Sequence, residues 1–241
     1  KGKVFSFEAI PHTSSEFIEN ISLNNCSNIT LIQKALSNEN KKVTFRIPDK
    51  GINHSMASMV WHKKEDNTIN VEVDSIILDE DKDLKNLSPS FVKIDVEGLE
   101  LDVLDSVLDV SKPFLIQIES NINSNLYSNT FNQIHKKLVS LNYDLVTFHP
   151  LYNYPEYSSV NKKLINDYYD YPRIRSKIMM ADSIYILKKK NTLREIIMLI
   201  GYGFLTEAFQ IFDKIEKKIE IKNRKKLKIF FKEHIPKTIF K

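Results

Sequence analysis

Glycine, cysteine and tryptophan are scarce in this chain of 241 residues, which has five glycines, one cysteine and one tryptophan. Gly2 is the only glycine before Gly51, so the early part of the chain holds no glycine-rich phosphate-binding loop. Cys26 stands alone, which excludes an intramolecular disulfide and favours a reducing, cytoplasmic compartment. No run of about 18 apolar residues occurs, so the sequence predicts no membrane-spanning helix.

The positive charge of the chain is concentrated near its C-terminus. Residues 188–241 carry 15 Lys and Arg against 6 Asp and Glu, a net charge of +9, whereas the residues before them carry −5 and the whole chain +4. The hydrophobic share of 42% is ordinary for a globular protein with a buried core. We therefore expect two parts, a main domain over residues 1–188 and a basic helical appendage over residues 189–241.

Short apolar stretches alternate with helical patterns along the main domain. Residues 4–7 and 29–33 are typical of strands, and residues 14–23 between them have helical spacing, with Ser14 or Ser15 as the cap. A strand, a helix and a strand within about 30 residues form a βαβ unit, which predicts an α/β fold with a parallel sheet. Further strands are predicted at 42–47, 68–73 (edge-like), 91–94, 113–120, 143–148 and 182–187, the last two as an antiparallel hairpin, and C-terminal helices at 193–200, 204–221 and 225–231.

The pattern changes abruptly after the strand predicted at residues 91–94. Asp95 and Glu97 come where this strand ends, Gly98 permits a tight turn, and residues 99–104 have helical spacing. Ligands bind at the carboxyl ends of strands in open α/β sheets, so carboxylates there are placed for a site. The alternative is that Asp95 and Glu97 only cap the helix and interact with its positive end.

Other candidate site residues end predicted strands or lie in predicted loops. Glu8 ends the first strand, where a carboxylate can accept hydrogen bonds from ribose hydroxyls or cap a helix. Glu119 ends a later strand and can act with Asp95 in proton transfer; a divalent cation held by the pair is not favoured. His54 and His149 are alternative general bases, unless they are merely exposed.

The turn at residues 93–100 resembles the signature of an enzyme family. Lys93-Ile94-Asp95-Val96-Glu97-Gly98-Leu99-Glu100, followed by Val103-Leu104, resembles the signature of the FkbM family of methyltransferases. Residues 2–11, 28–37 and 71–76 resemble further segments of that family, in the family's order. The resemblance is collinear over about the first 120 residues, which is more specific than any one segment alone.

This resemblance implies a Rossmann-like sheet, mostly parallel with an antiparallel last strand, and S-adenosylmethionine as the cofactor. It implies that Glu8 binds the cofactor ribose, that the turn at Ala35 and Leu36 borders the adenine, and that Asp95 and Glu97 flank the site of methyl transfer. The family's first strand would precede the segments found here, so the sheet is expected to lack its first strand in an N-terminally shortened chain. A degenerate relative that has lost cofactor binding is the alternative.

The expected reaction is methyl transfer to a hydroxyl group of a saccharide, a glycan or another small-molecule acceptor. Residues 151–171 contain six tyrosines and suggest a loop or lid that suits a ring-bearing acceptor. Residues 189–241 are compatible with a peripheral membrane surface, a protein partner or a solvated appendage. No aromatic-interleaved motif predicts a nucleic-acid partner. A non-catalytic binding or scaffold module of the same fold is the alternative function.

Overall fold

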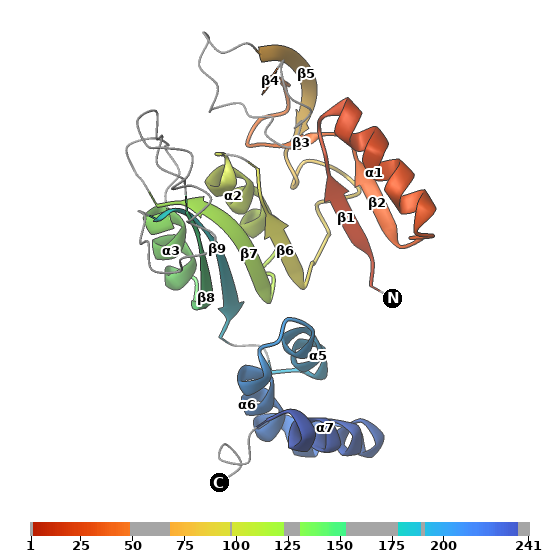
Figure 1. Ribbon diagram of the computed structural model, residues 1–241, viewed down its shortest axis with the longest axis vertical. Coiled ribbons are helices and arrows are strands. Elements are labelled where there is room, and N and C mark those ends of the chain that lie inside the picture. Colours follow the sequence, from red (N-terminus) through yellow and green to blue (C-terminus); the bar gives the residue numbers. More distant parts are fainter. Residues whose placement is uncertain are drawn as a thin grey trace, which may run out of the picture. The chain divides into compact units, whose positions relative to one another are not determined.

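The computed structural model describes residues 2–48, 68–96, 98–122, 131–152, 178–188 and 191–235. Its contacts divide the chain into two compact units, residues 1–186 and residues 187–241. The first unit contains the β-sheets, and the second is built from helices (Figure 1). His54, Glu97 and the tyrosine-rich residues 153–171 lie outside the described residues.

The first unit opens with the βαβ unit that the sequence predicts, formed by β1 (Val4–Phe7), α1 (Pro11–Leu23) and β2 (Ile29–Ile32). The two strands are parallel. The predicted helix start at Ser14 or Ser15 is wrong. The helix α1 begins at Pro11, a position at which the missing N–H of proline costs no hydrogen bond. Ser14 instead donates its hydroxyl to the carbonyl oxygen of Glu8 at 2.8 Å, which fixes the turn between β1 and α1.

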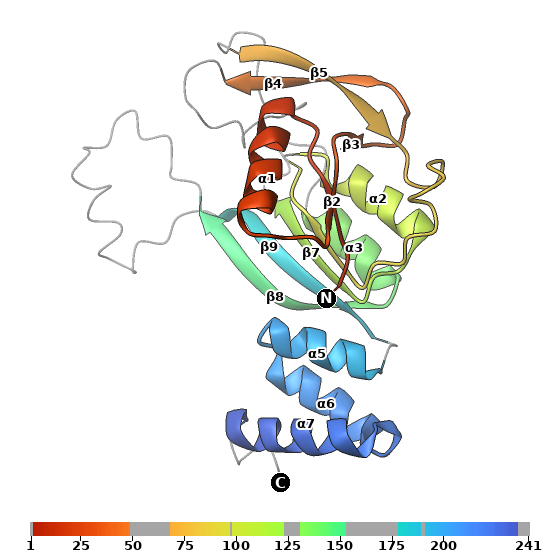
Figure 2. The same cartoon turned by 90° about the vertical axis from the view of Figure 1, so that its right-hand side faces the viewer.

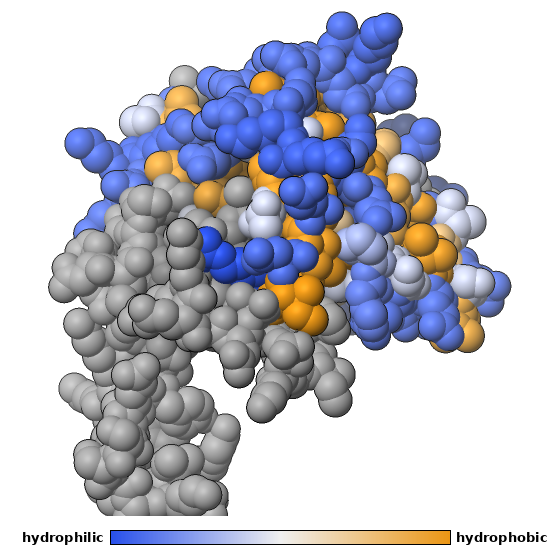
Figure 3. All heavy atoms as spheres, turned by 90° about the horizontal axis from the view of Figure 1, so that it is seen from above, coloured by the Kyte–Doolittle hydropathy of each residue, from blue (hydrophilic) through white to orange (hydrophobic). Residues whose placement is uncertain are grey.

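A three-stranded sheet follows, formed by β3 (Ala35–Leu36), β4 (Lys42–Pro48) and β5 (Thr68–Ile76) in the order β3-β5-β4. The strand β5 is parallel to β3 and antiparallel to β4. The prediction of an edge-like strand at residues 68–73 agrees with the pairing among the described strands, because β4 lies beside these residues and β3 pairs only with Ser75 and Ile76. Seen from above, much of the described surface at this end of the molecule is hydrophilic, with apolar side chains showing between (Figure 3).

The third sheet has the order β6-β7-β9-β8 and contains β6 (Phe91–Ile94), β7 (Leu115–Asn121), β8 (Tyr143–Tyr152) and β9 (Ile178–Leu187). The strands β6 and β7 are parallel, and β9 is antiparallel to β7, which confirms the expected antiparallel last strand. The helices α2 (Glu100–Val110) and α3 (Phe131–Ser140) follow β6 and β7 and cover one face of this sheet (Figure 2).

One apolar cluster connects the three sheets. Its buried residues are Ile76, Leu78, Leu84 and Val107, and partly buried side chains from β1, β2 and β6 pack against it: Phe7, Ile32 and Val92. Among the described strands, β1 pairs only with β2, and β6 pairs only with β7. Val4 and Phe5 of β1 are 45% and 38% exposed, although strands of a doubly wound parallel sheet normally bury both faces. Among the described strands, β1 and β6 therefore each have one backbone edge without a strand beside it.

The second unit is a small helical bundle of α5 (Leu193–Gly201), α6 (Leu205–Ile215), a short 3₁₀ helix (Glu216–Lys218) and α7 (Ile221–His234). Ile196, Leu199, Ala208 and Phe231 form its buried interior. The predicted helix at 204–221 is wrong in its length, because extended backbone at Ile219 separates α6 from α7. Among the described helices, none combines the length and apolar content that crossing a membrane requires.

We predict that Leu104→Ala lowers the free energy of unfolding by about 2–5 kcal/mol, because the Leu104 side chain is fully buried and its loss leaves a cavity. Leu23→Ala is the matched control, since Leu23 is 71% exposed and should lose less than about 0.5 kcal/mol. Urea denaturation followed by circular dichroism measures both values. Equal losses in the two variants would contradict the position of α2 in the core.

Candidate active site

Four charged side chains lie on one face of the third sheet. Lys93 and Asp95 come from β6 and the residues directly after it, Glu119 from β7 and Asp182 from β9, where the register places Glu119 opposite Asp182. The opposite face carries Tyr185, whose hydroxyl lies 3.2 Å from Nδ1 of His135 on α3. Side chains alternate along a strand, so the charged group lies on the face that α3 does not cover.

The charged group is held together by direct contacts. The Nζ atom of Lys93 donates a hydrogen bond of 2.7 Å to Oδ2 of Asp95, and the side chains of Asp95 and Glu119 are hydrogen-bonded to each other. The negative charge of Asp182 adds to the attraction on Lys93. The Asp95 side chain is nevertheless 38% exposed, so a ligand can reach it.

These contacts set the protonation of Asp95. Burial alone would raise the pKa of the Asp95 carboxyl, but the hydrogen bonds to Glu119 and Lys93 and the charge of Lys93 outweigh it, and the pKa is lowered. Asp95 is therefore a carboxylate at neutral pH and accepts the hydrogen bond from Lys93.

A buried glutamate holds the turn that carries Asp95. Glu100, the first residue of α2, is 3% exposed, and its Oε1 accepts a 2.8 Å hydrogen bond from the backbone N–H of Gly98. Gly98 has a φ of 108°, a conformation that glycine adopts at little cost. Burial raises the pKa of Glu100, although hydrogen bonds from the backbone N–H groups of Gly98, Glu100 and Val96 oppose the shift. The Oε2 atom is buried and has no hydrogen-bond partner among the described residues.

Glu8 lies at the carboxyl end of β1, as the sequence predicts. Its backbone N–H donates to the carbonyl oxygen of Ile32 on β2 at 3.2 Å, which continues the parallel pairing. Its Oε1 accepts a 2.8 Å hydrogen bond from the backbone N–H of Ile10, directly before α1. Burial raises the pKa of the Glu8 carboxyl, and the hydrogen bond from Ile10 lowers it in part. One carboxylate oxygen thus stabilises the turn, and no contact to the other is found within the described residues.

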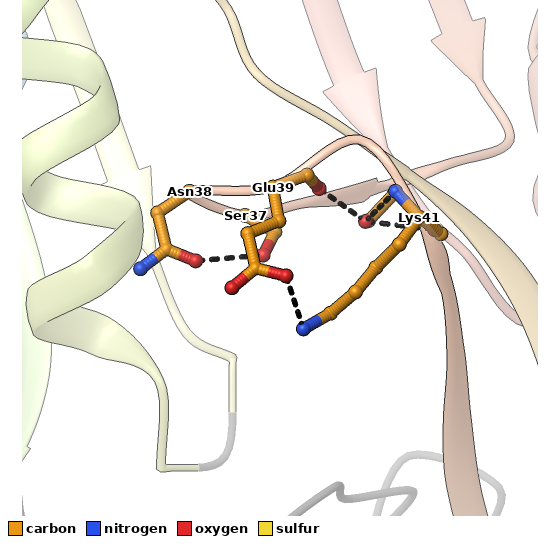
Figure 4. Close-up of polar contacts among 5 residues, drawn as sticks. Ser37, Asn38, Glu39 and Lys41 are labelled. Atoms are coloured by element: carbon orange, nitrogen blue, oxygen red, sulfur yellow. Dashed lines mark hydrogen bonds and ion pairs between the residues drawn. The ribbon is translucent and has the colours of Figure 1, made fainter.

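Ala35 and Leu36, the predicted adenine-side turn, form the short strand β3 instead of an open turn. Their side chains pack against two different apolar clusters. The buried hydroxyl of Ser75 on β5 binds the loop after them through two hydrogen bonds (Figure 4). It donates to the carbonyl oxygen of Glu39 at 2.6 Å and accepts a hydrogen bond from the backbone N–H of Lys41. The adenine role of this segment stays a prediction that would rest on backbone groups.

The structure does not bring His149 beside Asp95. His149 is exposed on β8, and its Nε2 lies 3.3 Å from the hydroxyl of Thr147. The strands β9 and β7 lie between β8 and β6, and strands are spaced by about 4.8 Å, so β8 is about 14 Å from the strand that leads into Asp95. Across the described parts of the chain, no group of three or more His, Cys, Asp or Glu side chains is placed to hold a metal ion.

A comparison with family models identifies the first unit. The model described as methyltransferase FkbM domain matches residues 1–145, more than half of the chain. The chain belongs to the FkbM methyltransferase family. No curated protein and no solved structure matches it. The matched residues include Glu8, Asp95 and Glu119, whereas Asp182 and the helical unit of this FkbM protein lie beyond the match. Family membership supports a methyltransferase and leaves the acceptor open.

Three residues of the site were not singled out in the sequence analysis. Lys93 and Glu100 belong to the signature, but nothing in the sequence shows that Lys93 contacts Asp95 or that Glu100 is buried. The i, i+2 spacing of Lys93 and Asp95 is the one available signal, because it places both on one face of a strand. Asp182 gave no signal, since its position opposite Glu119 depends on the pairing of β7 with β9.

We predict that Glu100→Ala lowers the free energy of unfolding by about 1–3 kcal/mol, because it removes the acceptor of the buried 2.8 Å hydrogen bond from the N–H of Gly98. Glu100→Gln keeps one acceptor oxygen and should lose less than Glu100→Ala. Urea denaturation measures both, with the exposed Glu19→Ala as the control. If Glu100→Ala were as stable as Glu19→Ala, Glu100 would not hold the turn.

Proposed function

We propose that this FkbM protein is an S-adenosylmethionine-dependent O-methyltransferase that acts on a hydroxyl group of a saccharide, a glycan or another small molecule. The observation that carries the proposal is the accessible Asp95 carboxylate, held by Lys93 and Glu119 at the carboxyl ends of two adjacent parallel strands. In open α/β sheets this edge is where ligands bind. The family match supports the class of reaction.

We infer that the sheets β1-β2 and β6-β7-β9-β8 are parts of one Rossmann-like sheet that is missing one strand. Two observations support this: each part has an open edge at a parallel strand, and one apolar cluster contacts both edge strands through Phe7 and Val92. A parallel strand between β1 and β6 would pair with both edges and cover the exposed Val4 and Phe5. The loop after that strand would then lie between the turns that follow β1 and β6.

The residues at the end of β1 fit the ribose of the proposed cofactor. Ribose hydroxyls are donors, and the Glu8 carboxylate has an oxygen that is not used by the Ile10 N–H. The position of Glu8 at the carboxyl end of a parallel strand, directly before α1, matches the place where ribose-binding acids occur in dinucleotide-binding folds. The raised pKa of Glu8 would fall when hydroxyl donors replace water around its charge.

The proposed cofactor supplies a methyl group that is already activated on its sulfonium sulfur. The chain has to orient the acceptor hydroxyl and take up its proton. Asp95 has a lowered pKa and is therefore a weak base, but a hydroxyl oxygen becomes strongly acidic as it forms the new bond to carbon. A weak base in fixed position is then sufficient. Lys93 and Glu119 keep the Asp95 carboxylate in place through hydrogen bonds on its two sides.

We predict that Glu8→Gln weakens the binding of S-adenosylhomocysteine by the value of one charged hydrogen bond, about 1.5–3 kcal/mol. Isothermal titration of the whole protein measures this loss. Glu19→Gln removes the same charge from an exposed position of α1 and should leave the affinity unchanged. An unchanged affinity in Glu8→Gln would remove Glu8 from the cofactor site. If the natural protein did not bind S-adenosylhomocysteine, the alternative hypothesis of a non-catalytic binding module would be favoured.

We predict that Asp95→Asn lowers turnover by about 10²–10⁴-fold, because the amide cannot accept the proton of the hydroxyl. Release of S-adenosylhomocysteine in the presence of a panel of saccharide acceptors measures turnover, and isothermal titration shows whether cofactor affinity is kept. Asp109→Asn, on the exposed side of α2, is the matched control. Near-normal turnover in Asp95→Asn would exclude Asp95 from proton transfer, and lost cofactor binding would place it in the cofactor site.

A further inference from the structure

The helix α7 presents a lysine face to solvent. Lys222, Lys225, Lys226 and Lys232 are exposed and follow one another at helical spacings that place them on one side. Ile229 is 58% exposed and lies three residues from Lys226 and from Lys232, so it stands among the lysines. The opposite side of α7 carries Leu227 and Phe231, which are buried in the helical unit. These four lysines and Ile229 are called the α7 lysine face.

The charge of this face is only partly neutralised among the described residues of the unit. Lys228, beside the face, pairs with Glu216 at 2.6 Å, and Arg224 donates to the carbonyl oxygen of Ile219 at 3.2 Å. No comparable ion pair is found for the four lysines of the face among the described residues. Glu233, the one acidic residue of α7, lies four residues after Ile229 and therefore on the same side of the helix, where it offsets one of the four positive charges. Like charges at three- and four-residue spacing destabilise a helix, so this arrangement suits an anionic partner that offsets the repulsion.

We propose that the α7 lysine face docks this protein on an anionic lipid surface, with the lysines at the headgroups and Ile229 at the boundary to the acyl chains. Lysines near such a surface attract it, and an apolar side chain among them adds buried area that a dissolved polyanion does not offer. The proposal is independent of the methyl transfer proposed above, because it concerns the second unit alone. The proposal places the protein at the surface of an anionic membrane.

A nucleic acid is the competing polyanion, and the side chains of the face favour it less. Proteins bind single strands by stacking bases on aromatic side chains and read duplexes mainly with arginine. The α7 lysine face contains neither. The Phe230 ring is stacked on the ring of His234, with centroids 4.2 Å apart, and the Arg224 guanidinium is engaged with backbone. A nucleic-acid partner is therefore an outcome of the test and not the proposal.

The test is sedimentation of the whole protein with vesicles of phosphatidylcholine alone and of phosphatidylcholine mixed with phosphatidylglycerol, at physiological salt. We expect binding to the anionic vesicles only. Lys225→Glu combined with Lys226→Glu should weaken it at least about 25-fold, about fivefold for each lysine lost. Ile229→Ser should weaken it several-fold. Lys82→Glu combined with Lys136→Glu removes the same charge from exposed positions of the first unit and should leave binding unchanged.

Four outcomes would overturn the proposal. The natural protein would fail to sediment with anionic vesicles, or the control pair would lose as much binding as the α7 pair, which would indicate net charge without a docking face. Ile229→Ser would bind anionic vesicles as tightly as the natural protein, which would contradict contact with the acyl boundary. Single- or double-stranded oligonucleotides would bind more tightly than anionic vesicles and displace the protein from them. Circular dichroism of each variant checks that the helices remain.

Discussion

The hydrogen bond from the backbone N–H of Gly98 to the buried Glu100 carboxylate is the contact on which the proposed site depends. It joins the end of β6 to the first turn of α2, so the chain reverses direction within a few residues. Asp95 lies directly before this turn and Glu100 directly after it. If the turn opened, Asp95 would lose its position opposite Glu119, although β6 and β7 would still pair. Glu100 acts through this backbone and is a positioning residue, whereas Asp95 is accessible from solvent.

The two faces of the strands β6, β7 and β9 carry different kinds of side chain. One face carries Ile94, Ile116 and Ile118, which are buried, and it packs against the helices that follow the strands. The other face carries Lys93, Asp95 and Glu119, which contact one another at the carboxyl end. Because side chains alternate, a single short strand such as β6 can contribute to the core and to the charged group at once. The side chains of the proposed site are therefore held on rigid elements.

The sequence predicted the elements whose pattern is local. The apolar run before Asp95, the turn at Gly98 and the spacing after it gave β6 and α2 nearly as they are. Pairing over long distances was not predictable in this way: no local pattern indicated that Ala35 and Leu36 form a strand that pairs with Ser75 and Ile76 of β5. The position of Asp182 in the charged group was not predictable either, because it depends on the register between β7 and β9, which places Asp182 opposite Glu119.

The boundaries of helices were predicted less well than their existence. The helix was predicted to begin at Ser14 or Ser15, yet Pro11 is a favourable first residue of a helix and α1 begins there. The apolar spacing through residues 204–221 continues across Ile219, where the backbone is extended. Ile215 before the break and Ile219 at it are both buried, so the apolar pattern does not reveal where the helix ends. In the site, the residue types at Glu8, Asp95 and Glu119 indicated function, but the contacts that set their charge became visible only in three dimensions.

The most direct test of the account is hydrogen–deuterium exchange of the whole protein with and without S-adenosylhomocysteine. The account predicts slower exchange in two separate peptides, the turn from Glu8 into α1 and the turn from Asp95 into α2, because both would contact one ligand at the carboxyl edge of one sheet. Protection at both turns together, with β8 unchanged, is the expected result. Exchange unaffected at both turns, or protection confined to the second unit, would contradict a cofactor site at the ends of β1 and β6.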